Sequence, residues 1–268
     1  MKKRHIVLGF LGTISVITFL DRLAIAVAGP QIQEQLHIRP ERWGWVLGAY
    51  VLAYGFFEIP SGAMGDRRGR RTELTRIVAW WSAFTALTGS CRNFLQLMSV
   101  RFLFGTGAAR AYPNIAGVIA EWFPSRERAR AQGVVWAASR LGGAIAPLLI
   151  VPLIAHVGWR SVFVLLGIVG FCWAALWRWW FHDSPADQPH ITQEELSELS
   201  AATPADGAHR RVPWRRLLSM RQLWLISLAY GCYGWGSWFY YSWFPVWMVR
   251  GAGFSVAQMG FLDRKSVV

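Results

Sequence analysis

Long apolar runs separated by short polar connections make up most of the chain. A helix needs about 20 residues to cross the hydrocarbon core of a bilayer, and each run reaches or approaches that length. The expected spans are residues 6–28, 44–64, 74–90, 95–122, 131–155, 161–181 and 223–249, and an eighth is expected to begin near residue 256. The pattern therefore predicts an all-α fold, a polytopic membrane helical bundle.

One connection is much longer than the others. Residues 182–222 form a polar stretch of about 40 residues, long enough to separate two bundles. Within it, Thr192 and Glu195 stand at the spacing of a capping box, which predicts a short surface helix. We expect a six-helix bundle over 1–181, a cytoplasmic connecting segment over 182–222 and the start of a second bundle over 223–268.

Composition and charge agree with a membrane protein. Of the 268 residues, 54% are hydrophobic, which excludes an ordinary soluble domain. The formal charge of +13 comes from lysines and arginines gathered at the amino terminus and in the second, fourth and sixth connections. This distribution follows the positive-inside rule and predicts a multi-pass cell-membrane protein with a cytoplasmic amino terminus. Because no base-reading polar residues are interleaved with the arginines, no nucleic-acid partner is expected.

The first span has a second interpretation. A basic start, an apolar core and the small residues of "AIAVA" also fit a cleaved signal peptide. However, Asp21 and Arg22 interrupt the region in which a signal peptide stays apolar. Removing this span would also invert the remaining helices relative to the arginine bias. We therefore expect the first span to be retained.

Several charged residues lie inside the expected spans. An Asp or Arg near the centre of a membrane helix costs about 2.5 to 3.5 kcal/mol on the insertion scale. Such residues usually face a water-filled cavity or one another, and many are functional. In this chain they are Asp21, Arg22, Glu58, Arg101, Arg110 and Arg140.

The depths of these charges predict which of them meet. Asp21 and Arg101 lie at a similar depth below the outer face, so they are expected to pair. Glu58, Arg110 and Arg140 lie near the midplane, which predicts one carboxylate among two guanidiniums if their helices face the same cavity. The alternative is that each pair only locks two helices together.

The residue types favour recognition of an anion. Arg22 presents a planar fork that suits a carboxylate, and Tyr54 and Tyr240 are amphipathic aromatics able to contact a sugar or ring face, although interfacial anchoring or packing explains a tyrosine equally well. The chain has no nucleophile and base pair, no metal-ligand spacing and no glycine-rich nucleotide loop. Neither an enzyme nor a metal or cofactor is expected.

The connection between the second and third spans contains the most specific motif. "GAMGDRRGRR" resembles the signature of the major facilitator superfamily at the same place in the topology. Its glycines permit close helix approach and a tight turn, and its arginines are expected to pair with acids such as Glu121 or with lipid phosphates. The residues expected to form this conformational gate are Gly62, Asp66, Arg67, Gly69, Arg70 and Arg71.

Other segments support a narrower resemblance. "DRLAIAVAGP", "RFLFGTGAARAYPNIAGVIAEWFPSRERARAQG" and "WFPVWMVRGAGFS" are similar to the anion:cation symporter family. The resemblance implies a secondary active transporter of an organic anion, such as a sugar acid or aromatic carboxylate, commonly coupled to protons by alternating access. It implies a bacterial inner-membrane location, with the anion, a proton and the bilayer as partners. The roles that follow are substrate binding by Arg22, Tyr54, Arg110 and Tyr240, and proton coupling by Asp21, Arg101 and Glu58.

The chain departs from this family in two ways. Ala108 stands where bacterial relatives commonly have an acid, and Arg110 where they have glycine, so Glu58 is a candidate substitute acid. Family members have twelve helices, whereas this chain ends in "FLDRKSVV" near the start of an eighth. We expect a truncated or chimeric reading frame, or assembly with another chain. The alternative function is a non-transporting membrane sensor or interaction protein.

Overall fold

The computed structural model describes residues 2–189, 191–200 and 218–254, and within them it contains helices and no strands. This confirms the all-α prediction. The elements are α1 (Lys3–Gln35), α2 (Pro40–Arg68), α3 (Arg70–Thr88), α4 (Phe94–Ala108), α5 (Ala111–Trp122), α6 (Ser125–Trp180), the 3-10 turn η1 (Pro185–Asp187), α7 (Gln193–Ser200), α9 (Arg221–Ser242) and α10 (Phe244–Arg250).

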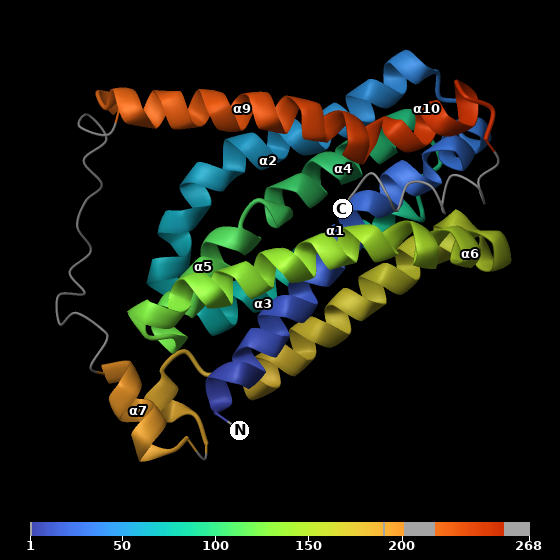
Figure 1. The fold of residues 1–268 in the computed structure, drawn as a ribbon. Coiled ribbons are helices and arrows are strands. Elements are labelled where there is room, and N and C mark those ends of the chain that lie inside the picture. The colour runs from blue at the N-terminus through green and yellow to red at the C-terminus, as the bar shows by residue number, and fades with distance from the viewer. Residues whose placement is uncertain (1, 190, 201–217, 255–268) are drawn as a thin grey trace.

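Helices α1 to α6 pack into one elongated bundle (Figure 1). The main pairings are α1 with α6, α3 with α6 and α2 with α4. Two apolar cores lie along this bundle, one around Trp81, Trp122 and Trp177 and the other around Trp43 and Trp159. Helix α9 runs along the outside, and α9 and α10 both contact α1. Among the described residues, the helices α1 and α6 are long and apolar enough to cross a membrane by length and composition.

Helix α6 contains two of the expected spans. Its backbone is helical on both sides of Gly158, which has a φ of 76°. That left-handed conformation favours glycine and turns the chain back on itself, so the two arms lie side by side in Figure 1. Spans 131–155 and 161–181 are therefore confirmed as an antiparallel pair.

The expected single span 95–122 is wrong in one respect, because the helix breaks between α4 and α5. Pro113 has no N–H to donate to the carbonyl of Ala109, one turn earlier, and its ring clashes there. The Asn114 side chain donates to the Arg110 carbonyl at 2.8 Å, which satisfies a second backbone group at the break. The expected span 223–249 breaks in the same way between α9 and α10. The expected eighth span lies outside the described residues.

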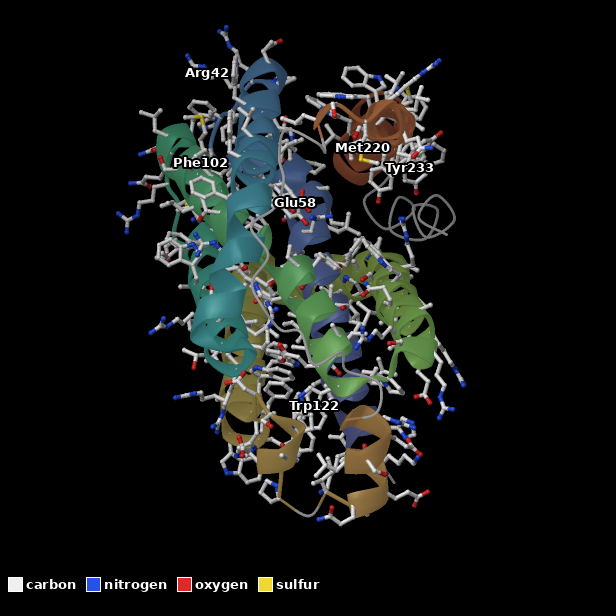
Figure 2. The ribbon with its side chains drawn as sticks, turned by 90° about the vertical axis from the view of Figure 1, so that its left-hand side faces the viewer. Arg42, Glu58, Phe102, Trp122, Met220 and Tyr233 are labelled. Atoms are coloured by element: carbon white, nitrogen blue, oxygen red, sulfur yellow. The ribbon has the colours of Figure 1, made fainter. Side chains whose placement is uncertain are left out.

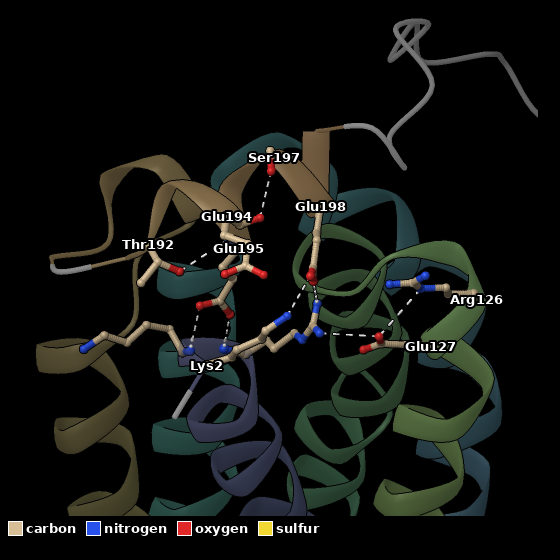
Figure 3. Close-up of polar contacts among 10 residues, drawn as sticks. Lys2, Arg126, Glu127, Thr192, Glu194, Glu195, Ser197 and Glu198 are labelled. Atoms are coloured by element: carbon tan, nitrogen blue, oxygen red, sulfur yellow. Dashed lines mark hydrogen bonds and ion pairs between the residues drawn. The ribbon is translucent and has the colours of Figure 1, made fainter.

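The predicted surface helix is α7, but its acids do more than cap it. The Glu195 N–H donates to Thr192 Oγ1 at 3.3 Å, which is one half of a capping box. The Glu195 carboxylate instead accepts the backbone N–H groups of Lys3 and Arg4 at 3.0 and 2.9 Å (Figure 3). Glu198 accepts hydrogen bonds from Lys2 and Arg4 at 2.7 and 2.8 Å. Helix α7 thus caps the start of α1, where orphan N–H groups favour an anion.

This docking is expected to depend on pH through Glu198. The hydrogen bond from Lys2, aided by Arg4, holds the pKa of Glu198 below its ordinary value. A depressed pKa means that the contact is fully present above the pKa of a free glutamate and is lost as the pH falls through the lower folded value. We expect hydrogen-exchange protection of the Lys3 and Arg4 amides to persist at neutral pH and to fall only in acid.

The same amides test the cap itself. Glu195→Gln should lower their protection at neutral pH by about tenfold, because a weaker acceptor replaces the carboxylate. Glu194→Gln is the matched control, since Glu194 lies on the exposed side of α7. Equal protection in the two variants would contradict the assignment.

Candidate functional site

The charged pair of α1 points in two directions. Asp21 is fully buried and faces α3, where Thr85 Oγ1 donates to its Oδ2 at 3.4 Å. Arg22 is only half-buried and turns toward α2, where its Nε donates to the Tyr50 hydroxyl at 2.8 Å. Neighbouring residues on a helix point about 100° apart, so one short sequence supplies two separate environments.

Arg101 of α4 completes the environment of Asp21. It is 1% exposed, and its guanidinium lies 4.4 Å from the ring centroid of Phe104. Its charge and that of Asp21 interact electrostatically, as expected from their depths. Among the described residues, however, Asp21 Oδ1 and two Arg101 nitrogens find no hydrogen-bond partner. The two groups are therefore near each other but not joined by a direct hydrogen bond, so each retains capacity for another partner.

Aromatic rings surround the Arg22 guanidinium. The guanidinium carbon lies 5.4 Å from the centroids of Phe19 and Tyr50 and 5.2 Å from that of Tyr54. The Tyr50 ring also lies 5.4 Å from the Arg101 guanidinium carbon, so this tyrosine is close to both arginines. A cation held in this way keeps its charge and fixes its orientation, which are the properties needed to bind a carboxylate.

A cavity of about 1080 Å³ opens between α2 and α9. Its wall on α2 includes Gly44, Leu47, Gly48 and Val51. Continuing by helical periodicity, Tyr54 and Glu58 belong to the same face of α2. Glu58 is exposed, acts electrostatically on both Arg22 and Tyr54, and lies about midway along α2 in Figure 2. Tyr54 and Glu58 thus continue, along α2, the face whose earlier turns line the opening.

The expected pairing of Arg110 with Glu58 is wrong, because Arg110 has a different acid as its partner. Arg110 lies 4.0 Å from the carboxylate of Glu73, a 2% exposed residue in the first turn of α3. Arg140 donates to the Tyr233 hydroxyl of α9 at 3.2 Å. Residues at equal depth therefore have partners on different helices, because depth does not specify the direction in which a side chain points. The sequence analysis did not identify Glu73 as a partner of Arg110.

The described part of the gate motif connects the start of α3 to α5 and α6. Gly69 has a φ of 79° and separates α2 from α3, as the tight turn requires. Arg70 bonds to Glu121 at 3.3 Å, which confirms the pairing expected from the sequence. Arg71 donates to the Arg178 carbonyl at 2.6 and 2.9 Å. The side chains of Gly62, Asp66 and Arg67 lie outside the described residues.

Two further residues complete the set expected from the sequence. Ala108, the position for which the sequence resemblance led us to expect an acid in relatives, is 2% exposed and is the last residue of α4, shortly before α5 begins. Tyr240 lies on α9, with its ring centroid 5.5 Å from that of Phe244. Its contacts therefore place it beside α10 rather than in the aromatic cage of Arg22.

A helical bundle with buried charges beside a large opening fits a membrane carrier, and residues 11–262 match the family model described as Major Facilitator Superfamily. The chain belongs to the Major Facilitator Superfamily. The match covers most of the chain, so it also supports the assignment of the bundle to a membrane protein.

Curated members of the superfamily that resemble the chain are named as transporters. The chain is 34% identical to a probable sulfoacetate transporter of Cupriavidus necator, over 97% of this chain and 60% of that protein. It is 30% identical to a probable L-galactonate transporter of Escherichia coli, over 92% of this chain and 55% of that protein. It is 28% identical to a hexuronate transporter of Bacillus subtilis, over 94% of this chain and 58% of that protein. These relatives are of the anion:cation symporter type and are not enzymes, which confirms the resemblance.

A solved structure supports the fold. The inward-facing, unoccupied crystal structure of a bacterial homologue of the human lysosomal transporter Spinster superposes with a TM-score of 0.79 at 20% identity. The alignment covers 98% of this chain and 59% of that one. The chain thus spans about 60% of the length of the proteins it matches.

Proposed function

We propose that the chain belongs to a secondary active transporter that moves an organic anion together with protons by alternating access. The anion is a sugar acid or a similar carboxylate. The observation that carries this proposal is the Arg22 guanidinium, held by three aromatic rings next to the fully buried Asp21. The relatives, which are named as sulfoacetate and sugar-acid transporters, support the substrate class.

The arrangement suits a division of roles. Arg22 and Tyr54 bind the carboxylate and the carbon skeleton of the anion. Asp21 carries the coupling proton. Arg101 interacts electrostatically with Asp21, and this interaction depends on whether Asp21 is charged. Glu58 is a second acid that acts on Arg22 from the cavity side. Substrate binding by Arg110 and Tyr240 stays a prediction, because Arg110 lies beside Glu73 and Tyr240 beside Phe244.

We propose that the chain is organised as the lengths of its connections predict. Residues 1–181 form a six-helix bundle, 182–222 connect it, and 223–268 begin a second bundle. In this arrangement the amino terminus and α7 lie on the cytoplasmic side of a bacterial inner membrane, where the basic connections also lie. The anion then binds at the face where α1, α2 and α9 approach one another.

Uptake in liposomes tests the function. The chain is reconstituted as given and, in parallel, as a fusion in which the segment after residue 254 comes from the sulfoacetate-transporter relative. We expect saturable uptake of a labelled sugar acid, driven by an imposed proton gradient, in at least one of these proteins, which is then called the transporting form. Binding of the acid without uptake by either protein would favour a sensor or interaction protein. Absence of both binding and uptake would refute the proposal.

A further inference from the structure

Three arginines lie in the first two turns of α6, and they differ in their partners. Arg126 Nε lies 3.8 Å from the Glu127 carboxylate. Arg128 donates to two carbonyls at the end of α5, at 3.0 and 2.7 Å. Arg130 is exposed, and no hydrogen bond or ion pair joins it to another residue that the structure describes. Its guanidinium is therefore the one of these three that can bind a group from outside the chain.

Arg130 lines a cavity of about 170 Å³ between α1 and α6. The exposed His5 of α1 lines the same cavity. Apolar side chains form most of its remaining wall, among them the half-buried Leu8, the 3% exposed Phe123 and the 42% exposed Val134. On each of the two helices the basic residue precedes the apolar one by about one turn. The cavity therefore has a basic end and an apolar end.

The basic end lies at the expected boundary of the membrane. The first and fifth expected spans begin at residues 6 and 131, directly after His5 and Arg130. At 1.5 Å per residue, Leu8 and Val134 lie about 5 Å further along their helices. Leu141, which is 56% exposed, follows seven residues later on the same face of α6. The cavity thus crosses from the headgroup level to the hydrocarbon, and exposed apolar side chains continue beyond it.

One acid also lines the cavity, and its charge is balanced within the protein. Glu127 Oε1 lies 3.4 Å from Arg4 Nη2 and 3.8 Å from Arg126 Nε (Figure 3). An anion bound to Arg130 would therefore meet a carboxylate that is already paired with two guanidiniums. A paired carboxylate can still accept a hydrogen bond from a hydroxyl group. The cavity thus offers a cation for a phosphate and an acceptor for a hydroxyl.

We propose that this cavity binds the headgroup of an anionic glycerophospholipid of the phosphatidylglycerol class. The lipid phosphate accepts hydrogen bonds from Arg130 and from the His5 imidazole. A hydroxyl of the terminal glycerol donates to Glu127, and an acyl chain lies over Val134 and Leu141. A soluble phosphate would use the basic end alone, so a lipid is the ligand that fits both ends. The site is separate from the proposed binding region for the transported anion and does not depend on it.

The test compares two lipids with identical acyl chains. The purified full chain is stripped of lipid in detergent, and binding of phosphatidylglycerol and of phosphatidylcholine is measured by native mass spectrometry. We expect phosphatidylglycerol to bind about tenfold more tightly. Arg130→Gln should reduce this preference to within about twofold, and His5→Ala should reduce it by about threefold. Arg130→Lys should keep most of it, because an ammonium also binds phosphate as a point charge.

A matched variant and two further ligands distinguish the outcomes. Arg126→Gln removes an equal charge from a side chain that is 74% exposed and does not line the cavity, so the preference should stay within about twofold of the parent. An equal loss in Arg126→Gln and Arg130→Gln would mean that the whole basic surface attracts anionic lipid, and the site would be refuted.

Phosphatidylethanolamine should bind more weakly than phosphatidylglycerol, because its ammonium would be a third cation beside Glu127. Equal or tighter binding of phosphatidylethanolamine would overturn the headgroup assignment. Millimolar sn-glycerol 3-phosphate should leave bound phosphatidylglycerol in place, and displacement would show that the ligand is a soluble phosphate ester. Equal binding of phosphatidylglycerol and phosphatidylcholine by the parent would refute the proposal.

Discussion

Arg22→Lys is expected to weaken binding of the organic anion by about tenfold or more, although the positive charge is kept. The Arg22 guanidinium donates from Nε to the Tyr50 hydroxyl, and in the proposed loaded state its planar fork also binds the carboxylate. A lysine has one nitrogen for both tasks, and its point charge lacks the fork that matches two carboxylate oxygens. Arg22→Ala should lose binding completely. Calorimetric affinity of the transporting form for its sugar acid is the measurement.

The control for this prediction is another arginine that lies over a ring. The Arg42 guanidinium carbon is 5.9 Å from the centroid of Phe94 at the far end of α2, so Arg42→Lys also exchanges a guanidinium for an ammonium beside an aromatic side chain. We expect its affinity for the acid to equal that of the parent. An affinity within about twofold of the parent in Arg22→Lys would show that simple charge attraction, rather than the fork, binds the anion.

The helical spans followed from the sequence because the length of an apolar run is a direct physical requirement of the bilayer. The interruptions were harder to place. Pro113 and Asn114 are visible in the sequence, but a proline within a membrane helix produces a kink in some contexts and is tolerated in others. Neighbouring helices decide the outcome, and here the Asn114 side chain bonds the Arg110 carbonyl at the break.

Partners of single side chains were predicted with mixed success, for a geometric reason. Depth along a helix can be counted in residues, and it correctly brought Asp21 near Arg101. The direction around the helix axis depends on how the helices pack, so Arg110 meets Glu73 rather than Glu58. An acid in the first turn of a helix is favourable by itself, which is why Glu73 gave no sign of a distant partner.

The capping box shows the same limit at the other end of the molecule. The spacing of Thr192 and Glu195 correctly predicted the start of α7. Spacing alone assigns the Glu195 carboxylate to its own helix, but in the folded protein it accepts two N–H groups of α1. A local pattern thus identifies a group able to cap a helix, and tertiary packing determines which helix it caps.

Asp21→Asn is expected to abolish accumulation driven by a proton gradient in the transporting form, while exchange of preloaded substrate continues. Asparagine resembles a protonated aspartate in shape and charge, so the variant mimics one loading state throughout the cycle. Exchange requires only that the loaded binding site open alternately to the two sides of the membrane. Net accumulation also requires that the proton be released from the site. Asp21 is buried next to Thr85, and a neutral asparagine of the same shape can occupy this position.

The matched control for Asp21 is an aspartate outside the bundle. Asp187 lies exposed in η1, and Asp187→Asn removes the same charge without altering the buried environment between α1 and α4. We expect it to accumulate substrate like the parent. If Asp21→Asn also accumulates substrate normally, then Asp21 does not carry the coupling proton. Because Ala108 provides no acid, the exposed Glu58 would then be the next carboxylate to test, by the same pair of accumulation and exchange measurements.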